Sequence, residues 1–144
     1  MPTRSHADAT LAFDVPADWV DRSIVVYSAP PGSAAVPPNF VVAYDRPAPG
    51  ETLAAYATRQ VTELTRTAQQ FQLDLRRDTT FAGRAAVELV FRWAAGPGTM
   101  QQRQLFSILT DGRVASVACT AAADDFPAAD EAFGDVLKSF RWTR

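Results

Sequence analysis

The sequence contains little of the chemistry on which most active sites depend. It has one histidine, His6, and one cysteine, Cys119, in 144 residues. A Ser-His or Cys-His catalytic arrangement would have to use His6, which we expect to be a solvated residue near a frayed N-terminus. A single cysteine allows no internal disulfide, which fits a reducing compartment. Cys119 lies in an apolar stretch without a basic neighbour, so we expect it to be buried and unreactive.

Signatures of metal, phosphate and nucleic-acid sites are also missing. The chain has only 7 glycines and no phosphate-binding loop among them. His, Cys and carboxylate residues do not cluster at the spacing of metal ligands. The 14 Lys and Arg residues are outnumbered by 16 Asp and Glu residues, which gives no concentrated basic surface for nucleic acid. We therefore expect no cofactor, no metal, no nucleic-acid partner and no enzymatic activity.

Long apolar runs are absent as well. No stretch approaches the roughly 18 apolar residues that a membrane-spanning helix requires. The first residues, which read MPTRSHAD, have no apolar core of the kind found in a signal peptide. We expect a cytoplasmic protein that does not insert into a membrane and that forms a single domain over residues 1–144.

Two short runs that are present, Ile24–Tyr27 and Phe40–Tyr44, are apolar on both faces of a strand. Successive side chains of a strand point to opposite faces, so such runs usually belong to a sheet that is covered on both sides. The chain contains one long and one short helical pattern, which is little cover for a whole sheet. We therefore predict that one sheet face is left apolar and open, and open apolar faces commonly bind a partner.

The pattern of the whole chain predicts an α+β fold. Apolar residues recur at helical spacing over residues 52–70, with Thr52 as the N-cap, and a second helix starts at Asp124 or Asp125 with Pro127 in its first turn. Asp111-Gly112 indicates a two-residue hairpin turn. Short connections favour a twisted antiparallel sheet of about six to seven strands. The predicted strands are 11–15, 23–28, 39–45, 73–80, 85–93, 99–109 and 114–120.

Several polar residues lie among apolar ones. Gln102 and Gln104 share a predicted strand face with apolar neighbours, and Gln60 lies at the edge of the apolar stripe of the long helix. Neutral amides in such places can bind polar groups of a partner without the desolvation cost of a charge, or they can be ordinary half-exposed residues. Glu88 is flanked by apolar residues, and we expect it to pair with an arginine on a neighbouring strand.

Several short motifs are distributed over nearly the whole chain. They are Asp14-Val15-Pro16 followed by Trp19, Asp21 and Ser23-Ile24; Arg59-Gln60; Gly83-Arg84-Ala85-Ala86-Val87 with Trp93; and Arg103-Gln104 with Phe106. In their order and with similar gaps, these motifs resemble those of DcrB-like proteins, and among them the Eag-type chaperones of type VI secretion.

The resemblance implies a PsbP/Mog1-like fold and a cytoplasmic homodimer without a cofactor. It also implies a partner, the N-terminal region of a secreted toxin, in which transmembrane helices lie beside a PAAR domain. The chaperone would shield those helices in a hydrophobic groove on the sheet. The resemblance places Ile24, Val26 and Val41 at apolar positions of that groove, and Gln60 and Gln104 at its polar positions.

Joined to the strand pattern, the resemblance predicts a division of the two apolar runs. Val25, Tyr27, Phe40 and Val42 should point toward the helices, and Ile24, Val26 and Val41 should line the open face with Gln104. Other interpretations remain. The chain could be a general PsbP/Mog1-like interaction module, an envelope DcrB-like protein or a binder of small ligands in a deep pocket. Helices and a dimer mate could also cover both faces.

Overall fold

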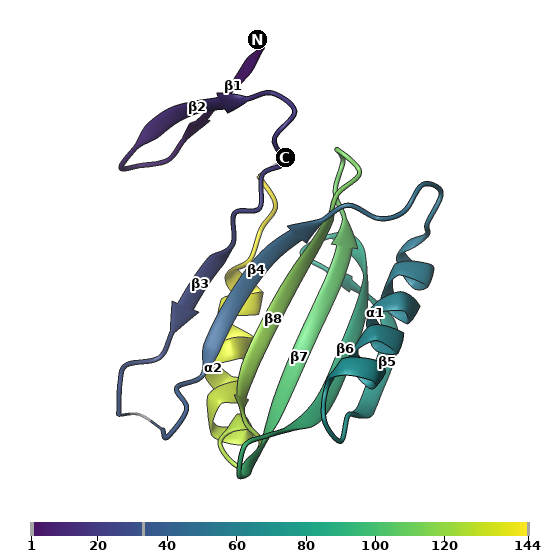
Figure 1. Cartoon of the computed structure of the whole chain (residues 1–144). Helices are drawn as coiled ribbons and strands as arrows, with labels where there is room; N and C mark the ends of the chain where they lie inside the picture. Colours follow the sequence, from purple (N-terminus) through teal and green to yellow (C-terminus); the bar gives the residue numbers. More distant parts are fainter. Residues whose placement is uncertain (1, 33, 144) are drawn as a thin grey trace.

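The computed structural model, which describes residues 2–32 and 34–143, contains one large sheet, two helices and a separate hairpin (Figure 1). The large sheet has six strands in the order β3-β4-β8-β7-β6-β5, and β1 and β2 form the hairpin. Neighbouring strands are antiparallel throughout. The elements are β1 (Thr3–Ala7), β2 (Ala12–Pro16), β3 (Val25–Ser28), β4 (Asn39–Asp45), α1 (Leu53–Thr67), β5 (Gln72–Phe81), β6 (Arg84–Ala95), β7 (Gly98–Ile108), β8 (Val114–Ala122) and α2 (Phe126–Ser139).

The two helices lie on opposite sides of the large sheet. α1 packs on β6 and β7, whereas α2 packs on β8 (Figure 1). Neither helix is wide enough to cover six strands, so each leaves part of its own side without helical cover. The α+β class and the antiparallel sheet are as the sequence predicts.

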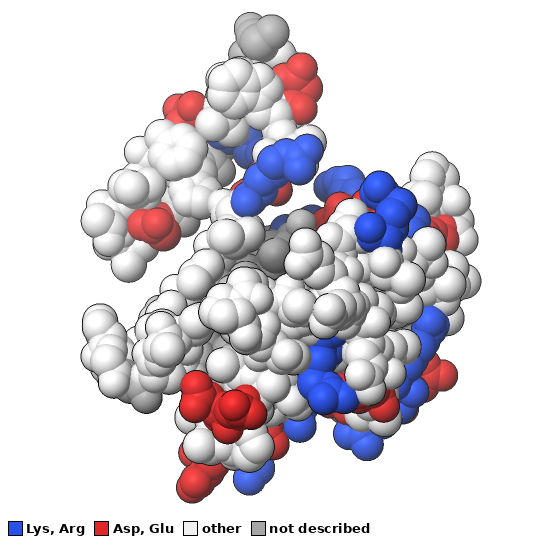
Figure 2. Space-filling view, turned by 60° about the horizontal axis from the view of Figure 1, so that its bottom comes forward, with Lys and Arg blue, Asp and Glu red and all other residues white. Residues whose placement is uncertain are grey.

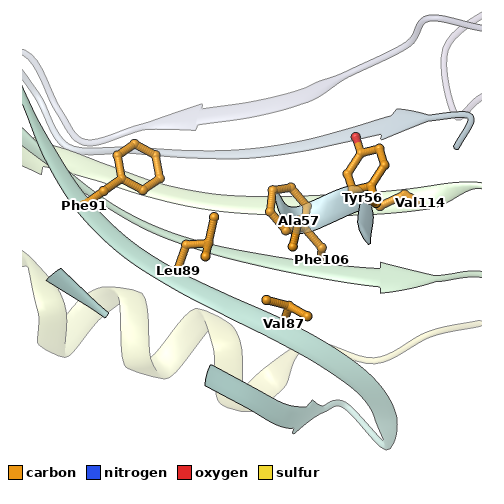
Figure 3. Close-up of a cluster of buried hydrophobic side chains, with 7 residues drawn as sticks. All are labelled: Tyr56, Ala57, Val87, Leu89, Phe91, Phe106 and Val114. Carbon is orange, nitrogen blue, oxygen red and sulfur yellow. The ribbon is translucent and has the colours of Figure 1, made fainter. Parts of the chain in front are cut away.

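α1 is anchored by its cap and by one apolar stripe. The hydroxyl of Thr52 accepts a hydrogen bond from the backbone N–H of Ala55 at 3.1 Å, which satisfies one of the free donors of the first turn. The stripe packs on the sheet in a cluster of buried side chains (Figure 3). That cluster consists of Tyr56, Ala57, Val87, Leu89, Phe91, Phe106 and Val114.

α2 closes the other side of the sheet. Pro127 lies in its first turn, as predicted, and Asp125 occupies the N-cap position, although its side chain makes no capping hydrogen bond. The helix and the segment after it pack on two clusters of buried residues. Those clusters are Val42, Phe81, Ala86, Leu105 and Val117, and Cys119, Ala121, Phe126 and Phe133.

Residues 3–7 form the strand β1, so the predicted frayed end around His6 is wrong. β1 pairs with β2 over its whole length, and Ser5 donates a hydrogen bond to Asp14 at 2.7 Å. His6 is half-buried, and its ring stacks on Phe13 with 4.8 Å between ring centroids. β1 is polar and pairs with the exposed strand β2. Its sequence therefore has no regular spacing of apolar residues from which the strand could have been predicted.

The turn between β7 and β8 lies where Asp111-Gly112 predicts it, but the connection is longer than two residues. It spans residues 109–113 and is closed by a hydrogen bond from the backbone N–H of Leu109 to the carbonyl of Arg113 at 2.7 Å. The Asp111 carboxylate accepts from the backbone N–H of Arg113 at 3.1 Å, and Gly112 takes φ +87°. The aspartate thus builds a local turn inside the loop rather than a tight hairpin.

Candidate binding surface

The side chains of strand β4 point alternately to the two sides of the sheet. Val42 is buried in the core under α2, and Phe40 packs against the same core. Because strand side chains alternate, Val41 and Ala43 point to the side of the sheet that carries α1. Phe40 and Val42 point toward α2 and Val41 points to the other side, as predicted. The prediction that both helices cover one face and leave the other open is wrong, because the side of Val41 carries α1 over β6 and β7.

The edge strand β3 is exposed on both of its sides. Val25 and Tyr27 lie on the α2 side but are 45% and 72% exposed, because α2 packs over β8 and a cleft lies between it and Tyr27. The expectation that a helix covers them is wrong. Val26 is 51% exposed on the α1 side, and Ile24, which immediately precedes the strand, is 58% exposed. Ile24 lies outside β3 and has no partner on β4, so the strand pairing does not assign it to a side.

Three of the residues singled out by the sequence fall in one row across the sheet. Val26 pairs with Val41, Val41 with Ala118, and Ala118 with Gln104, so the row crosses β3, β4, β8 and β7 on the α1 side. The next residue of the row, Leu89, is fully buried beneath α1. The row therefore runs from an exposed apolar edge to the foot of the helix.

Gln60 lies on the flank of α1 that faces this row. One flank is fixed against β5, where Arg76 donates hydrogen bonds to the hydroxyl of Thr58 and the carbonyl of Ala54 at 2.8 and 2.9 Å. The other flank faces β4, because the hydroxyl of Tyr56 donates a hydrogen bond to the carboxylate of Asp45, the last residue of β4, at 2.8 Å. Gln60 follows Tyr56 by one turn and is half-exposed. The helix edge thus borders the uncovered strands, as the family resemblance requires.

The hydrogen bond of Tyr56 holds this border in place. Burial raises the pKa of its phenol well above the ordinary value, and the hydrogen bond to Asp45 raises the pKa further. The phenol therefore remains a donor at neutral pH.

We call the uncovered α1-side surface of β3, β4, β8 and β7 the open face. It has an apolar strip on β3 and β4, a strip of small residues on β8 and an amide strip on β7. None of these side chains is charged, and Figure 2 shows a broad uncharged area with charged side chains around it. The open face is defined as Val26, Val41, Ala43, Gln102, Gln104, Ser116, Ala118 and Thr120, together with Ile24 just before β3; Ser28 and Asn39 continue the same side of β3 and β4 beyond it.

The polar side chains of the open face form one hydrogen-bonded chain. The Thr120 hydroxyl donates to Gln102 Oε1 at 3.0 Å, Gln102 Nε2 donates to Gln104 Oε1 at 3.1 Å, and Gln104 Nε2 donates to the Ser116 hydroxyl at 2.7 Å. We call these four residues the amide ladder. The two glutamines were found from the sequence, but their partners were missed; these are Ser116, which is half-buried, and Thr120, which is buried at 9% exposure.

The uncovered part of the α2 side has a different character. Across β5 and β6, Arg77 pairs with Glu88 at 2.7 Å and Arg92 pairs with Asp74 at 2.8 Å. Leu75 is 38% exposed beside them. The predicted pairing of Glu88 with an arginine is confirmed, and the carboxylate is more deeply buried than an outward-facing residue would be. We call this surface the charged half.

Two clefts lie away from the open face. One of about 740 Å³ separates the N-terminal hairpin from the ends of β4 and β8, with Trp19, Tyr44 and Arg113 in its lining. The other, of about 430 Å³, lies between Tyr27 of β3 and Ala132 of α2. Neither includes any of the five residues that the family resemblance assigns to a groove.

The described part of the chain offers little for metal or membrane chemistry. Between residues 2–32 and 34–143, His, Cys, Asp and Glu side chains do not gather into a group of three or more that could hold a metal ion. Over the same residues, neither helix has the length and apolarity needed to span a bilayer.

Comparison with known proteins gives relatives in sequence and in fold. The model of the DcrB family matches residues 11–139. A Pseudomonas aeruginosa protein, Effector EagT6, is 29% identical over 93 residues, which cover 65% of this chain and 65% of that protein. The chain thus spans slightly less than two thirds of the curated relative that it matches.

Solved structures share the fold at lower identity. PA94 of Pseudomonas aeruginosa, a protein of unknown function, has a TM-score of 0.85 at 22% identity, with 99% of this chain and 98% of that chain covered. LpqN, involved in cell envelope biogenesis of Mycobacterium tuberculosis, has a TM-score of 0.59 at 14% identity, covering 82% and 83%. The cyanobacterial PsbP of Synechocystis sp. PCC 6803 has a TM-score of 0.52 at 14% identity, covering 95% and 89%. These matches establish a PsbP-like fold.

Proposed function

The chain belongs to the DcrB family, and from this premise we propose that it is a chaperone of a type VI secretion effector. In this proposal it acts in the cytoplasm, where it binds the N-terminal transmembrane helices of a PAAR-containing toxin and shields them from water until the toxin is loaded. Its relative Effector EagT6 supports the type VI connection. The role requires no catalysis and no cofactor.

The observation that carries the proposal is the row from Val26 to Gln104. The apolar side chains of Val26 and Val41 are followed by the small side chain of Ala118 and then by an amide. An apolar helix could place its side chains on the valines and bring its backbone close over the small residues of β8. The amide could then meet a polar group on the helix.

The dimensions of the open face suit a single helix. The row from β3 to β7 spans three strand spacings, which is about 14 Å. A helix with its side chains is about 10–12 Å across. A helix lying along the strands would thus fit between the edge of the sheet and the flank of α1 that carries Gln60.

Burial of apolar area supplies the driving force. A transmembrane helix in water exposes an apolar surface, and each 100 Å² of it that is removed from water contributes about 2.5 kcal/mol. The absence of charged side chains on the open face matters equally, since a charge buried without a partner would oppose binding.

The proposal includes a homodimer. The N-terminal arm, which is the β1-β2 hairpin and the segment between it and β3, supports this part of the proposal. Large apolar side chains of this arm lie exposed in the single chain, among them Phe13 at 49%, Trp19 at 63% and Val20 at 61%. The hairpin projects from the large sheet (Figure 1), and isolated two-stranded hairpins are only marginally stable in water. A second copy would bury part of this surface, and a two-fold axis would offer two open faces to one client.

Co-expression tests the proposal. The probe is the N-terminal fragment, with transmembrane segments and PAAR domain, of the effector encoded beside this gene. We expect the fragment to be soluble and to co-purify with the chain. The double variant Ile24→Asp with Val26→Asp should abolish co-purification, because it places two charges under the bound helix.

The same edge strand provides a matched control. Val25 and Tyr27 are also exposed but lie on the opposite side, so Val25→Asp with Tyr27→Asp disturbs the strand equally and should leave binding intact. If the fragment is equally soluble without the chain, the proposed function is wrong. If both double variants lose binding, or neither does, the open face is not the binding surface.

A further inference from the structure

We infer that Gln102, Ser116 and Thr120 are positioning residues that hold the Gln104 amide, so that the open face prefers apolar helices carrying small hydroxyl side chains over purely apolar ones. The inference rests on the proposed function and concerns which helices the face selects. It is carried by the amide ladder.

The ladder has one direction along its whole length. Each donor points the same way, from the Thr120 hydroxyl through the amides of Gln102 and Gln104 to the Ser116 oxygen. Amides and hydroxyls linked head to tail polarise one another, which strengthens each bond of the series. A reversal of one glutamine amide alone would bring two donors or two acceptors together, so the ladder couples the orientations of the two amides, which can reverse only together.

Both ends of the ladder belong to one strand. Ser116 and Thr120 lie on β8 with Ala118 between them, and the glutamines lie on β7 opposite Thr120 and Ala118. A glutamine on an open strand face would ordinarily sample several rotamers, and ordering it on binding costs entropy. Here the hydroxyls of β8 hold both amides in place before a client arrives, which removes part of that cost.

A count of hydrogen-bonding groups shows what the ladder still offers. An amide nitrogen carries two N–H groups, and the ladder uses one on Gln102 and one on Gln104. The Ser116 oxygen accepts within the ladder, so its own hydrogen also remains available. Unpaired donors are tolerated less well in buried places than carbonyl oxygens with a spare lone pair. A client that covers this face should therefore bring hydrogen-bond acceptors.

A helix can bring such acceptors without bringing charge. The hydroxyl oxygen of a serine or threonine accepts a hydrogen bond, and these side chains are small enough for close approach over Ala118. A helix of leucine and alanine alone would cover the remaining N–H groups and leave them without partners. The ladder thus distinguishes two helices of equal length and similar apolar area.

The probes are two maltose-binding-protein fusions that each carry a 22-residue helix of leucine and alanine. One helix has serine at three central positions on one face, and the other has alanine there. We expect the full-length chain to bind the serine form about tenfold more tightly, as one to two net hydrogen bonds would give. Affinities are measured by titration calorimetry.

Variants of the ladder separate positioning from folding. Ser116→Ala combined with Thr120→Val should reduce the preference to less than about twofold, because both ends of the ladder are lost while the apolar surface is kept. Ser116→Thr combined with Thr120→Ser keeps both hydroxyls and should restore the preference. A purely structural role would change the melting temperature or both affinities together.

The outcomes distinguish this inference from the proposed function. If neither helix binds, the proposed function fails and the inference fails with it. If both helices bind with equal affinity, or if the double variant keeps the full preference, the ladder does not select the client and only the inference is overturned.

Discussion

Two parts of the large sheet lack helical cover, and they are built differently. The open face, on the side of α1, has valine, isoleucine, small residues and amides. The charged half, on the side of α2, has ion pairs across its strands, between Arg77 and Glu88 and between Arg92 and Asp74. Both result from the same cause, because two helices on opposite sides of a six-stranded sheet each leave strands uncovered.

The difference shows that lack of cover does not by itself explain the open face. Where uncovered strands need only contact water, this chain places charged pairs, as β5 and β6 show. On β3 and β4, equally uncovered, it places Val26 and Val41, and no charged side chain interrupts the row to Gln104. An apolar surface of this kind has a cost in solubility, and a bound partner is the simplest reason to retain it.

The largest effect is expected when a charged side chain, of the kind found on the charged half, is introduced on the open face. In Val41→Lys the free chain should fold, because a lysine can extend its charged end into water from a half-exposed position. A bound helix would bury that charge, so we expect the affinity for the effector fragment to fall about 100-fold. Calorimetric titration of wild type and variant measures the ratio.

The control for this change lies in the charged half. Leu75 is 38% exposed, and Leu75→Lys should change the affinity by less than about twofold. Equal losses in the two variants would mean that the client does not distinguish the two surfaces, and the comparison between them would then carry no functional meaning.

A smaller effect is expected in the stability of the charged half. Arg77 is largely exposed, whereas the Glu88 carboxylate that it contacts is buried. Arg77→Ala leaves a buried charge without a partner and should lower the free energy of unfolding by about 2 kcal/mol. In Glu88→Gln the arginine can turn to water, so about 1 kcal/mol is expected.

Urea unfolding measures both variants, and binding of the effector fragment should be unchanged in each. If the glutamate variant were the less stable of the two, the burial asymmetry would not determine the strength of this pair. If either variant weakened client binding, the charged half would belong to the binding surface.

Local patterns were sufficient to predict much of this fold. The period of the long helix, the capping by Thr52 and the strand alternation each depend on residues close together in the chain, and the structure confirms them. Two features were missed because they depend on contacts between segments that are far apart in the chain. β1 has no apolar period, and the exposure of Val25 and Tyr27 follows from the position of α2 over β8.

For the candidate site, too, some residues could be predicted from the sequence but their arrangement in space could not. Val26, Val41 and Gln104 could be selected from the sequence, but their alignment in one row depends on the register of four strands. Ser116 and Thr120 look unremarkable in sequence, since their role appears only when β8 lies beside β7. Register across a sheet involves distant segments, and a single sequence does not display it.

A change in labelling rate is also expected, and it compares the open face with the charged half directly. Cysteine is introduced at Val26 of the open face or at Leu75 of the charged half, which are 51% and 38% exposed. The native Cys119 should not react, because it is 1% exposed and burial raises the pKa of its thiol to about 12. Each variant therefore reports on one surface without removal of the native thiol.

With the effector fragment at about ten times its Kd, roughly nine-tenths of the chain is bound, so labelling at Val26→Cys should slow about tenfold. Labelling at Leu75→Cys should change by less than about twofold, since the client would leave the charged half in water. Bromobimane fluorescence follows both rates. Protection at both positions would indicate a client that wraps the sheet, and protection at Leu75→Cys alone would place the binding surface on the side that carries the ion pairs.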